Sequence, residues 1–367
     1  MNGTHILELN RSELAELVLE HRRNLPAFYP QAMSPWIAMS LMQKAIRRGE
    51  VDWALTGAAA LLQNSPERLW RRLGITAYED IGVGDFDAVA LTTAGLTGKV
   101  WRRGVGGEWA VASFLVQRLC RSVKCRTADD LAMVCMEHPS LEQARHEFPG
   151  LTTPELLEII TGDGDLPRRA LALWYAMGTD RYRGDGLQKR RGEPQAVLDA
   201  LCDHGYPDTV IEVCREGLKK TGEILPAFLT LLWQELEHSD SHVEPDSIPP
   251  EEIINGVPSW AYGFHTRDGK GSLRAFQNME CETTRWLRDT VTLKDRGHVL
   301  GEMLFRIESG GVDRRLNWDV GNCIRRMADL ESYGISAADA EVGLRLLRND
   351  LAVLNESRRT VMSRFDV

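Results

Sequence analysis

The sequence lacks any apolar run long enough to cross a bilayer. Its longest apolar stretches, such as 171–177 and 227–233, are far shorter than the roughly 20 residues that a membrane helix needs. The N-terminal residues place charged side chains where a secretory signal has an apolar core and a small-residue cleavage site. These absences predict a cytoplasmic protein with no membrane segment.

The sequence also lacks the cysteine spacing of a disulfide framework or a structural metal site. Seven cysteines are scattered over 367 residues, and no two of them form a C-x-x-C pair. His238 and His242 stand four residues apart among carboxylates, a spacing that would present two metal ligands on one helix. The Ser-Asp-Ser between them favours a frayed helix end instead. We therefore expect reduced thiols, no metal ion and no cofactor.

Catalytic motifs are missing as well. The chain contains no G-x-S-x-G elbow and no H-E-x-x-H motif, and no cysteine lies in a catalytic signature. The run 93–100 (TAGLTGKV) comes nearest to the phosphate-binding pattern G-x-x-x-x-G-K-[ST], but threonine replaces its first glycine and valine its final hydroxyl residue. The sequence thus gives no support for a nucleotide-hydrolysing site and favours a protein that is not an enzyme.

An excess of positive charge is absent too, since 44 basic and 53 acidic residues give a net charge of −9. This balance argues against binding of nucleic acid through bulk charge, although local patches can still bind it. Two basic clusters stand out, with tryptophans and tyrosines nearby in sequence that could stack on bases. Solvated helix faces are the alternative interpretation. The clusters are Lys99, Arg102, Arg103, Arg118, Arg121, Lys124 and Arg126, and then Arg168, Arg169, Arg181, Arg183, Lys189, Arg190 and Arg191.

Helix start and stop signals are abundant. Ser34-Pro35 combines an N-cap residue with a proline at the first helical position, and Gly49 follows the apolar period of the next residues. Similar signals recur along the chain, with short connections, while alternating β-type runs are scarce. The sequence predicts an all-α fold, a multi-helical array of antiparallel helical hairpins. We expect an N-terminal helical extension (1–33), a helical domain (34–150), a second helical segment (151–240), a linker (241–259) and a C-terminal helical domain (260–367).

The first helical domain carries a recognisable order of motifs. KAIRRG is followed by an acidic residue and AL, and then by an RRL helix containing Arg71 and Arg72 that ends in Glu79-Asp80-Ile81-Gly82. This order resembles the C-terminal region of the replication-associated recombination protein A family (RarA, also called MgsA), over about 34–135. The resemblance implies a helical, clamp-loader-collar-like first domain that serves oligomerisation, outside the ATPase core of that family. The ATPase activity of the family is not implied.

Glu79 and Asp80 form the most unusual local feature of this region. Two carboxylates at a helix C-terminus oppose the helix macrodipole, so we expect compensation by nearby cations. The preceding hairpin offers Arg47 and Arg48 for a structural ion pair, or the carboxylates could cap the next segment. Metal binding or catalysis is the alternative, since perturbed carboxylates also occur at functional sites.

The segment 258–276 (PSWAYGFHTRDGKGSLRAF) resembles a binding loop most closely. It combines aromatic residues and glycines with His265, Arg267 and Lys270, before a helix that we expect from Leu273. Glycine-rich backbone at a helix start can bind an anion through amides and the helix dipole. We therefore predict an anion or nucleic-acid contact here, with a plain turn as the alternative. The other candidate contacts are Arg102, Arg103, Arg121, Lys124 and Arg126.

Taken together, these features predict a non-catalytic helical protein that assembles with itself or docks onto a protein partner in DNA replication or repair. The assembly role comes from the resemblance. Direct nucleic-acid binding through the basic clusters and segment 258–276 is the first alternative. An enzyme that acts on a phosphorylated substrate is the second, with the glycine-containing segment as the anion cradle.

Overall fold

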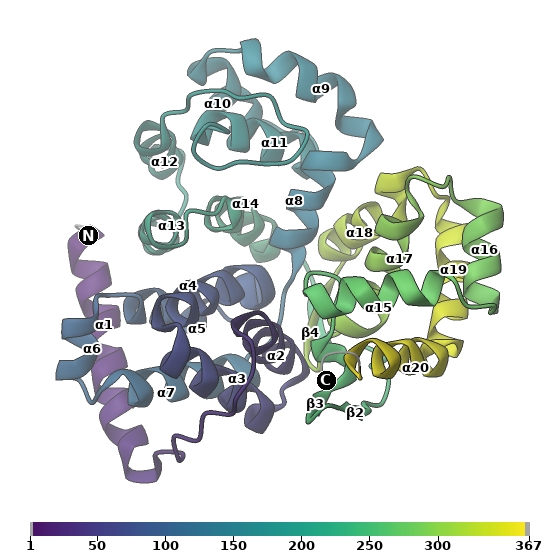
Figure 1. Ribbon diagram of the computed structural model, residues 1–367. Helices are drawn as coiled ribbons and strands as arrows, with labels where there is room; N and C mark the ends of the chain where they lie inside the picture. The colour runs from purple at the N-terminus through teal and green to yellow at the C-terminus, as the bar shows by residue number, and fades with distance from the viewer. Residues whose placement is uncertain (1–2, 364–367) are drawn as a thin grey trace. The chain divides into compact units, whose positions relative to one another are not determined.

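A computed structural model describes residues 3–363, and in this part of the chain the all-α prediction is confirmed. Twenty α-helices account for most of the structure (Figure 1). Two small antiparallel sheets complete it: β1 (Ser241–Glu244) pairs with β4 (Arg315–Trp318), and β2 (Ile253–Ile254) with β3 (Val257–Pro258). None of the helices described is both long and apolar enough for a membrane span.

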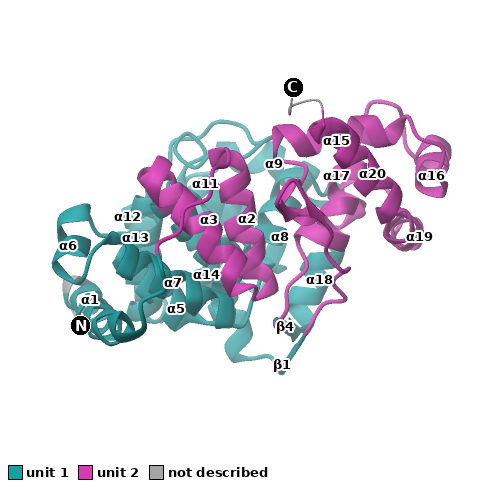
Figure 2. Cartoon of the chain, turned by 60° about the horizontal axis from the view of Figure 1, so that its bottom comes forward, with its two compact units in different colours: residues 1–27, 70–244, 315–328 teal, residues 28–69, 245–314, 329–367 magenta. Residues whose placement is uncertain are grey.

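The helices form two compact units, each assembled from stretches far apart in sequence (Figure 2). Unit 1 consists of residues 1–27, 70–244 and 315–328, and unit 2 of residues 28–69, 245–314 and 329–367. Helix α4 (Pro66–Thr76) contains one of the boundaries. The units cut across the predicted segments. The region 34–135 that resembles the RarA family gives its first helical hairpin to unit 2 and the remainder to unit 1.

Unit 1 is built around α11, in which every residue except Arg168 is buried. This helix packs against α8, α10 and α14, which supply further leucines and alanines to the core. The other α-helices of unit 1 surround them. In chain order the α-helices of this unit, apart from α4, are α1 (Gly3–His21), α5 (Phe86–Gly95), α6 (Lys99–Gly104), α7 (Glu108–Arg121), α8 (Thr127–Glu137), α9 (Glu142–Glu147), α10 (Thr153–Thr161), α11 (Leu166–Met177), α12 (Pro194–Asp203), α13 (Asp208–Thr221), α14 (Leu225–Glu237) and α18 (Asp319–Ala328).

Unit 2 combines one early helical hairpin with a late group of helices. The hairpin is α2 packed on α3, and a cluster of buried leucines, valines and methionines joins the late helices. Helix α15 packs along α20. The α-helices are α2 (Pro35–Arg48), α3 (Val51–Asn64), α15 (Arg267–Gln277), α16 (Glu282–Thr290), α17 (Arg296–Leu304), α19 (Ala337–Asn349) and α20 (Leu351–Met362).

The predicted ends of α2 are confirmed in atomic detail. Ser34 Oγ accepts a hydrogen bond from the Ile37 amide at 3.2 Å, and Pro35 occupies the first helical position. Gly49 ends the helix with φ of 71°, a left-handed conformation that glycine adopts without steric cost. A Cβ on Gly49 would also approach Asp313 Oδ2 to 2.3 Å. The glycine is therefore needed twice, for its φ angle and for this close contact.

Segments 241–259 and 258–276 differ from their predicted forms. The expected linker carries β1, β2 and β3, and the Asp246 amide donates to the carbonyl of Val312 at 2.9 Å. The helix expected from Leu273 begins at Arg267, because Thr266 caps it: Thr266 Oγ1 accepts from the Gly269 amide at 2.9 Å. The predicted binding loop is thus, in its second half, the first turns of α15.

We expect Gly217→Ala to destabilise the protein. Gly217 lies in α13, and a Cβ there would come within 2.1 Å of the hydroxyl oxygen of Tyr78, whose buried ring is held by hydrogen bonds to Thr93 and to the Val213 carbonyl. Overpacking costs about 1–3 kcal/mol, which outweighs the gain of about 1 kcal/mol from alanine in a helix when the neighbour cannot move. Urea denaturation gives the free energy of unfolding.

The matched control is Gly271→Ala in α15, where the nearest atom to a new Cβ is a Val361 methyl at 3.4 Å. Here the helix propensity acts alone, so we expect unchanged or slightly increased stability. Equal effects of the two substitutions would contradict the packing assigned to Tyr78.

Candidate functional site

Arg126 lies at the centre of a buried ion-pair cluster in unit 1. Its guanidinium donates to the carboxylates of Asp80 and Asp129 and, at 3.4 Å, to Glu79 Oε1. The side chains of Arg126 and Asp80 are 1% and 0% exposed. Burial by itself lowers the pKa of Arg126, but these three carboxylates and Asp130 outweigh this and raise it overall. The arrangement keeps Arg126 charged and ties the π-helical turn η2 (Ala77–Ile81) to the start of α8.

The structural ion pair expected for Glu79 and Asp80 is therefore confirmed, with Arg126 as the partner that the structure shows. Arg47 and Arg48 belong to unit 2, where they donate to the backbone carbonyls of Ser309 and Glu308. Proximity in sequence suggested the preceding hairpin, whereas the actual partner stands 46 residues after Asp80.

Two further members of the first basic cluster are also enclosed. Arg102 is 6% exposed, lies over the Trp70 ring at 3.9 Å and pairs with Glu108 at 3.1 Å. Lys124 is fully buried, and its ammonium group donates to the Cys120 carbonyl at 2.6 Å. Protein groups already surround Arg102, Lys124 and Arg126, and this does not favour the nucleic-acid contact predicted for them. Arg103 and Arg121 are exposed.

The structure also places the other motif residues of the RarA-like region, Arg71, Arg72 and Gly82. Arg71 is exposed and pairs with Glu223 at 3.3 Å, while Arg72 is half-buried. Gly82 has φ of 52°, and a Cβ there would approach the Cys125 carbonyl oxygen to 2.6 Å. The Cys125 amide donates to the Ile81 carbonyl at 3.1 Å. Gly82 thus allows the backbone after η2 to lie directly against the segment that carries Arg126.

Two of the three residues predicted in segment 258–276, His265 and Lys270, come together around Phe264. His265 lies 5.3 Å from the Phe264 ring between centroids, and Lys270 Nζ lies 5.5 Å from it. Arg267 is in the first turn of α15, and all three side chains are exposed. Gly269 is needed for packing, since a Cβ there would come within 2.0 Å of the Gly263 carbonyl oxygen. These residues start a helix and do not form a glycine-rich cradle.

The spacing of His238 and His242 does not place them on one helix. His238 caps the C-terminal end of α14, and His242 lies on β1. Within residues 3–363 there is no group of three histidine, cysteine or carboxylate side chains arranged to hold a metal ion.

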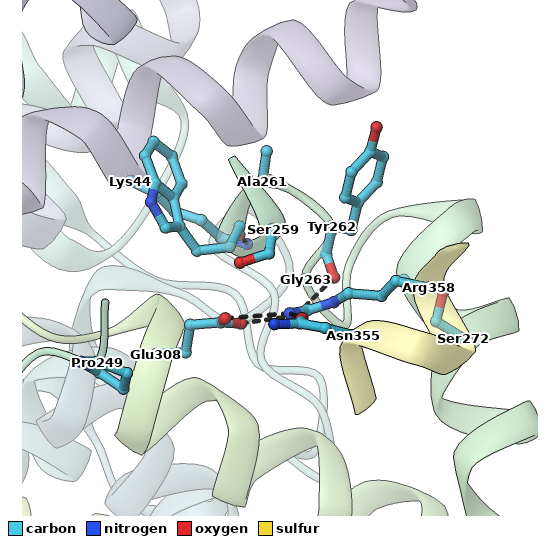
Figure 3. A network of polar contacts seen from close by, with 12 residues as sticks. Lys44, Pro249, Ser259, Ala261, Tyr262, Gly263, Ser272, Glu308, Asn355 and Arg358 are labelled. Atoms are coloured by element: carbon cyan, nitrogen blue, oxygen red, sulfur yellow. Dashed lines mark hydrogen bonds and ion pairs between the residues drawn. The ribbon is translucent and has the colours of Figure 1, made fainter. Parts of the chain in front are cut away.

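Sequence reasoning missed a buried charge network in unit 2 (Figure 3). Arg358 on α20 forms a bidentate pair with Glu308, at 3.0 Å and 2.6 Å, and donates to Asn355 Oδ1 at 2.7 Å. Arg358 is 0% exposed and Glu308 is 4% exposed. Although burial raises the pKa of Glu308, Arg358 and then Lys44 and Arg48 outweigh it and lower that pKa. The network joins α20 to the π-helical turn η7 (Phe305–Ser309).

Lys44 completes this network from α2. Its ammonium group donates to the Trp260 carbonyl at 2.5 Å, and a Cβ on Gly263 would come within 2.1 Å of Nζ. The absence of a side chain at Gly263 therefore makes room for the lysine. Burial lowers the pKa of Lys44 to about 7. The attraction of Glu308 acts in the opposite direction, but the repulsion of three neighbouring arginines counteracts it. The KAIRRG motif thus supplies three buried cations to unit 2, namely Lys44, Arg47 and Arg48.

The second basic cluster contains a different kind of feature, a long irregular loop between α11 and α12 (Figure 1). We call residues 178–193 the cationic loop. Gly178, with φ of 101°, and Gly192 close its base: a Cβ on Gly192 would lie 2.2 Å from the Gly178 nitrogen. The Asp180 amide donates to the Arg190 carbonyl at 3.1 Å, and the Arg190 amide to Thr179 Oγ1 at 2.8 Å. These bonds give the loop a defined conformation.

Side chains of the core hold the loop from beneath. The Trp174 indole donates to the Tyr182 carbonyl at 2.6 Å, and a Cβ on Gly184 would come within 2.6 Å of the Trp174 ring. Arg190 turns inward and donates to the carbonyls of Tyr175 at 2.7 Å and Leu151 at 3.0 Å. The loop is therefore packed on α11 along most of its length.

Four cations of the loop point outward: Arg181, Arg183, Lys189 and Arg191 are all exposed. Within residues 3–363 none of the four forms an ion pair with a carboxylate. Arg181 lies over the ring of Tyr182 at 5.4 Å. With Arg190 the loop carries five cations against three carboxylates, Asp180, Asp185 and Glu193, so it has an excess of two positive charges. The density of arginines indicated this cluster in the sequence. Only the structure shows that Arg169 and Arg190 bond to protein groups, whereas these four cations do not form ion pairs.

We expect Asp80→Asn to destabilise unit 1 by about 3–5 kcal/mol, because it leaves the buried Arg126 charge without its closest carboxylate. The measurement is the free energy of unfolding by chemical denaturation. As a control, Glu223→Gln removes the exposed partner of Arg71 and should cost less than about 1 kcal/mol. An unchanged stability of Asp80→Asn would refute the structural role of this cluster.

Lys44 should make stability depend on pH above neutrality. Its pKa is about 7 in the folded protein and 10.5 in a model peptide, so the unfolded chain binds more protons between these values. Stability therefore rises with pH in this window, by up to about 1.4 kcal/mol per pH unit from this group. Urea denaturation of Lys44→Met at pH 7 to 9 should show a flatter profile. Lys219→Met, at an exposed lysine, should keep the original profile; a parallel shift of both variants would contradict the assignment.

Comparison of the chain with protein-family models, with curated proteins and with solved structures finds no match. The resemblance to the C-terminal region of the RarA family therefore stays a prediction that rests on the motifs at 43–88.

Proposed function

We propose that this chain is a non-catalytic helical docking protein of DNA replication or repair that binds the nucleic-acid backbone through the cationic loop. One observation carries the proposal: a hydrogen-bonded loop presents four exposed cations that form no ion pair with a carboxylate of the described chain. The link to DNA metabolism comes from the resemblance to the RarA family.

The contrast with the rest of the molecule supports this choice. Most other cations discussed above are buried or paired, as with Arg126 in unit 1 and Arg358 in unit 2. A paired cation must break its pair before it can bind a phosphate, whereas an unpaired one releases only water and counterions. Phosphate binding therefore costs less at the loop than at these paired cations. Its fixed conformation also reduces the entropy lost on binding.

A second candidate function is assembly, which the RarA-like motifs imply. The observation that favours it is the exposure of large aromatic side chains in unit 2, with Tyr29 76% and Trp36 58% exposed. Exposed apolar groups that lie close in sequence are typical of protein-binding surfaces. Light scattering that finds a monomer at all concentrations, unchanged by Tyr29→Ser and Trp36→Ser, would remove this candidate.

We expect neutralisation of the loop to abolish nucleic-acid binding. Fluorescence anisotropy with labelled DNA at low and physiological salt measures the affinity. Loss of four phosphate contacts should weaken binding by at least about 100-fold at physiological salt and flatten its salt dependence. The variant replaces four residues by glutamine: Arg181, Arg183, Lys189 and Arg191.

The matched control changes the net charge equally but at cations that already pair with carboxylates. It should bind like the unmodified protein, because each of these cations already lies within 4 Å of a carboxylate oxygen. If both variants lose affinity equally, bulk charge and not the loop is responsible. The control replaces Arg71, Lys99, Lys219 and Lys220 by glutamine.

A further inference from the structure

We infer that the cationic loop recognises duplex nucleic acid through phosphates alone, without stacking on bases and without reading sequence. This inference rests on the proposed function and adds the class of ligand. It follows from where the aromatic side chains of unit 1 lie.

The aromatic residues beside the loop cations are all in the interior. Trp174 and Tyr182 are each 2% exposed, and Tyr175 is 0% exposed. Their work is structural: Trp174 supports the loop backbone at Tyr182 and Gly184, and its ring packs edge-on against Phe228 at 5.6 Å. Tryptophans and tyrosines near arginines suggest base stacking in the sequence, but here no aromatic face is left for a base.

Elsewhere in unit 1 the aromatic side chains are buried or half-buried; the half-buried ones are Phe86, Trp101, Trp109, Phe114 and Trp233. In the part of this unit that the structure describes, no phenylalanine, tyrosine or tryptophan side chain is exposed. Proteins that bind single strands obtain about 1–3 kcal/mol per base from stacking on exposed aromatic side chains. Because the aromatic side chains beside the loop are buried, the loop gains little from unpaired bases, and phosphate contacts supply most of its affinity.

Phosphate contacts favour the duplex. Double-stranded DNA carries about one charge per 1.7 Å of axis, and each neutralised phosphate contributes about −0.9 to the salt slope, against about −0.7 for a single strand. Four contacts therefore predict a slope of about −3.6 on a duplex and about −2.8 on a single strand. Three of the four side chains are arginines, whose planar guanidinium suits phosphate geometry.

The fixed loop conformation argues against sequence reading as well. Base readout needs an element that enters a groove, such as a helix or a two-stranded ribbon. The cationic loop instead lies along α11, held by Trp174, Arg190 and the Gly178 and Gly192 pair. It can reach the phosphates that project from a duplex but not the base edges between them.

The test uses the full chain with a duplex and with a single strand of the same sequence, the latter also carrying 2-aminopurine as a stacking reporter. We expect tighter binding of the duplex, a salt slope of about −3 to −4, equal affinity for two unrelated duplex sequences, and unchanged 2-aminopurine emission. Arg183→Gln should lower the magnitude of the slope by about 1 and weaken both duplexes equally. Circular dichroism confirms that this variant is folded.

Tighter binding of the single strand with quenched 2-aminopurine, or a tenfold difference between the two duplexes, would overturn the inference while leaving nucleic-acid binding intact. No binding of either form would remove the proposed function together with the inference. Polyglutamate that displaces the duplex at equal charge concentration would assign the loop to an acidic polypeptide and would likewise overturn the inference.

Discussion

A buried cation must be surrounded by acceptors, and this constraint organises both units. In unit 1 the Arg126 guanidinium joins η2 to the start of α8 through Asp80, Glu79 and Asp129. In unit 2 Arg358 joins α20 to η7 through Glu308. Helices that are held only by apolar packing can slide or rotate at small cost, but a buried ion pair has one geometry in which both charges are satisfied. The charged clusters therefore fix how these elements meet.

The same constraint gives meaning to cations without partners. In an interior, an unpaired charge would be too costly to exist, so unpaired cations are confined to the surface, where water solvates them. A cation that only water solvates can exchange this water for a phosphate at small cost. The cationic loop is such a surface. Its backbone is held by hydrogen bonds within the loop, from Thr179 Oγ1 to the Gln188 carbonyl and from the Arg190 amide to Thr179 Oγ1. Order in the backbone together with unsatisfied charge distinguishes it from a solvated helix face.

Local signals in the sequence predicted those structural features that depend only on residues close together in the chain. The all-α class and the ends of α2 at Ser34 and Gly49 follow from capping and glycine chemistry, which act within a few residues. Pairings across the chain could not be predicted this way. Asp80 had arginines close in sequence and bonds to Arg126 instead, and no local pattern relates Glu308 to Arg358. Periodicity states that a face is buried, but it does not state which distant segment covers it.

The candidate site shows the same division. The density of arginines in the second cluster was visible in the sequence, but the burial of Trp174 and Tyr182 beneath the loop was not. Net charge argues against the proposed contact, because −9 suggests repulsion of a polyanion. At physiological ionic strength charges are screened over about 8 Å, so a bound phosphate responds to the cations of the loop far more than to carboxylates elsewhere on the surface. Lowering the salt extends the reach of both, and the distant carboxylates then oppose the loop. A local cluster on an acidic protein is therefore most selective near physiological salt, where only groups in contact with the ligand still act.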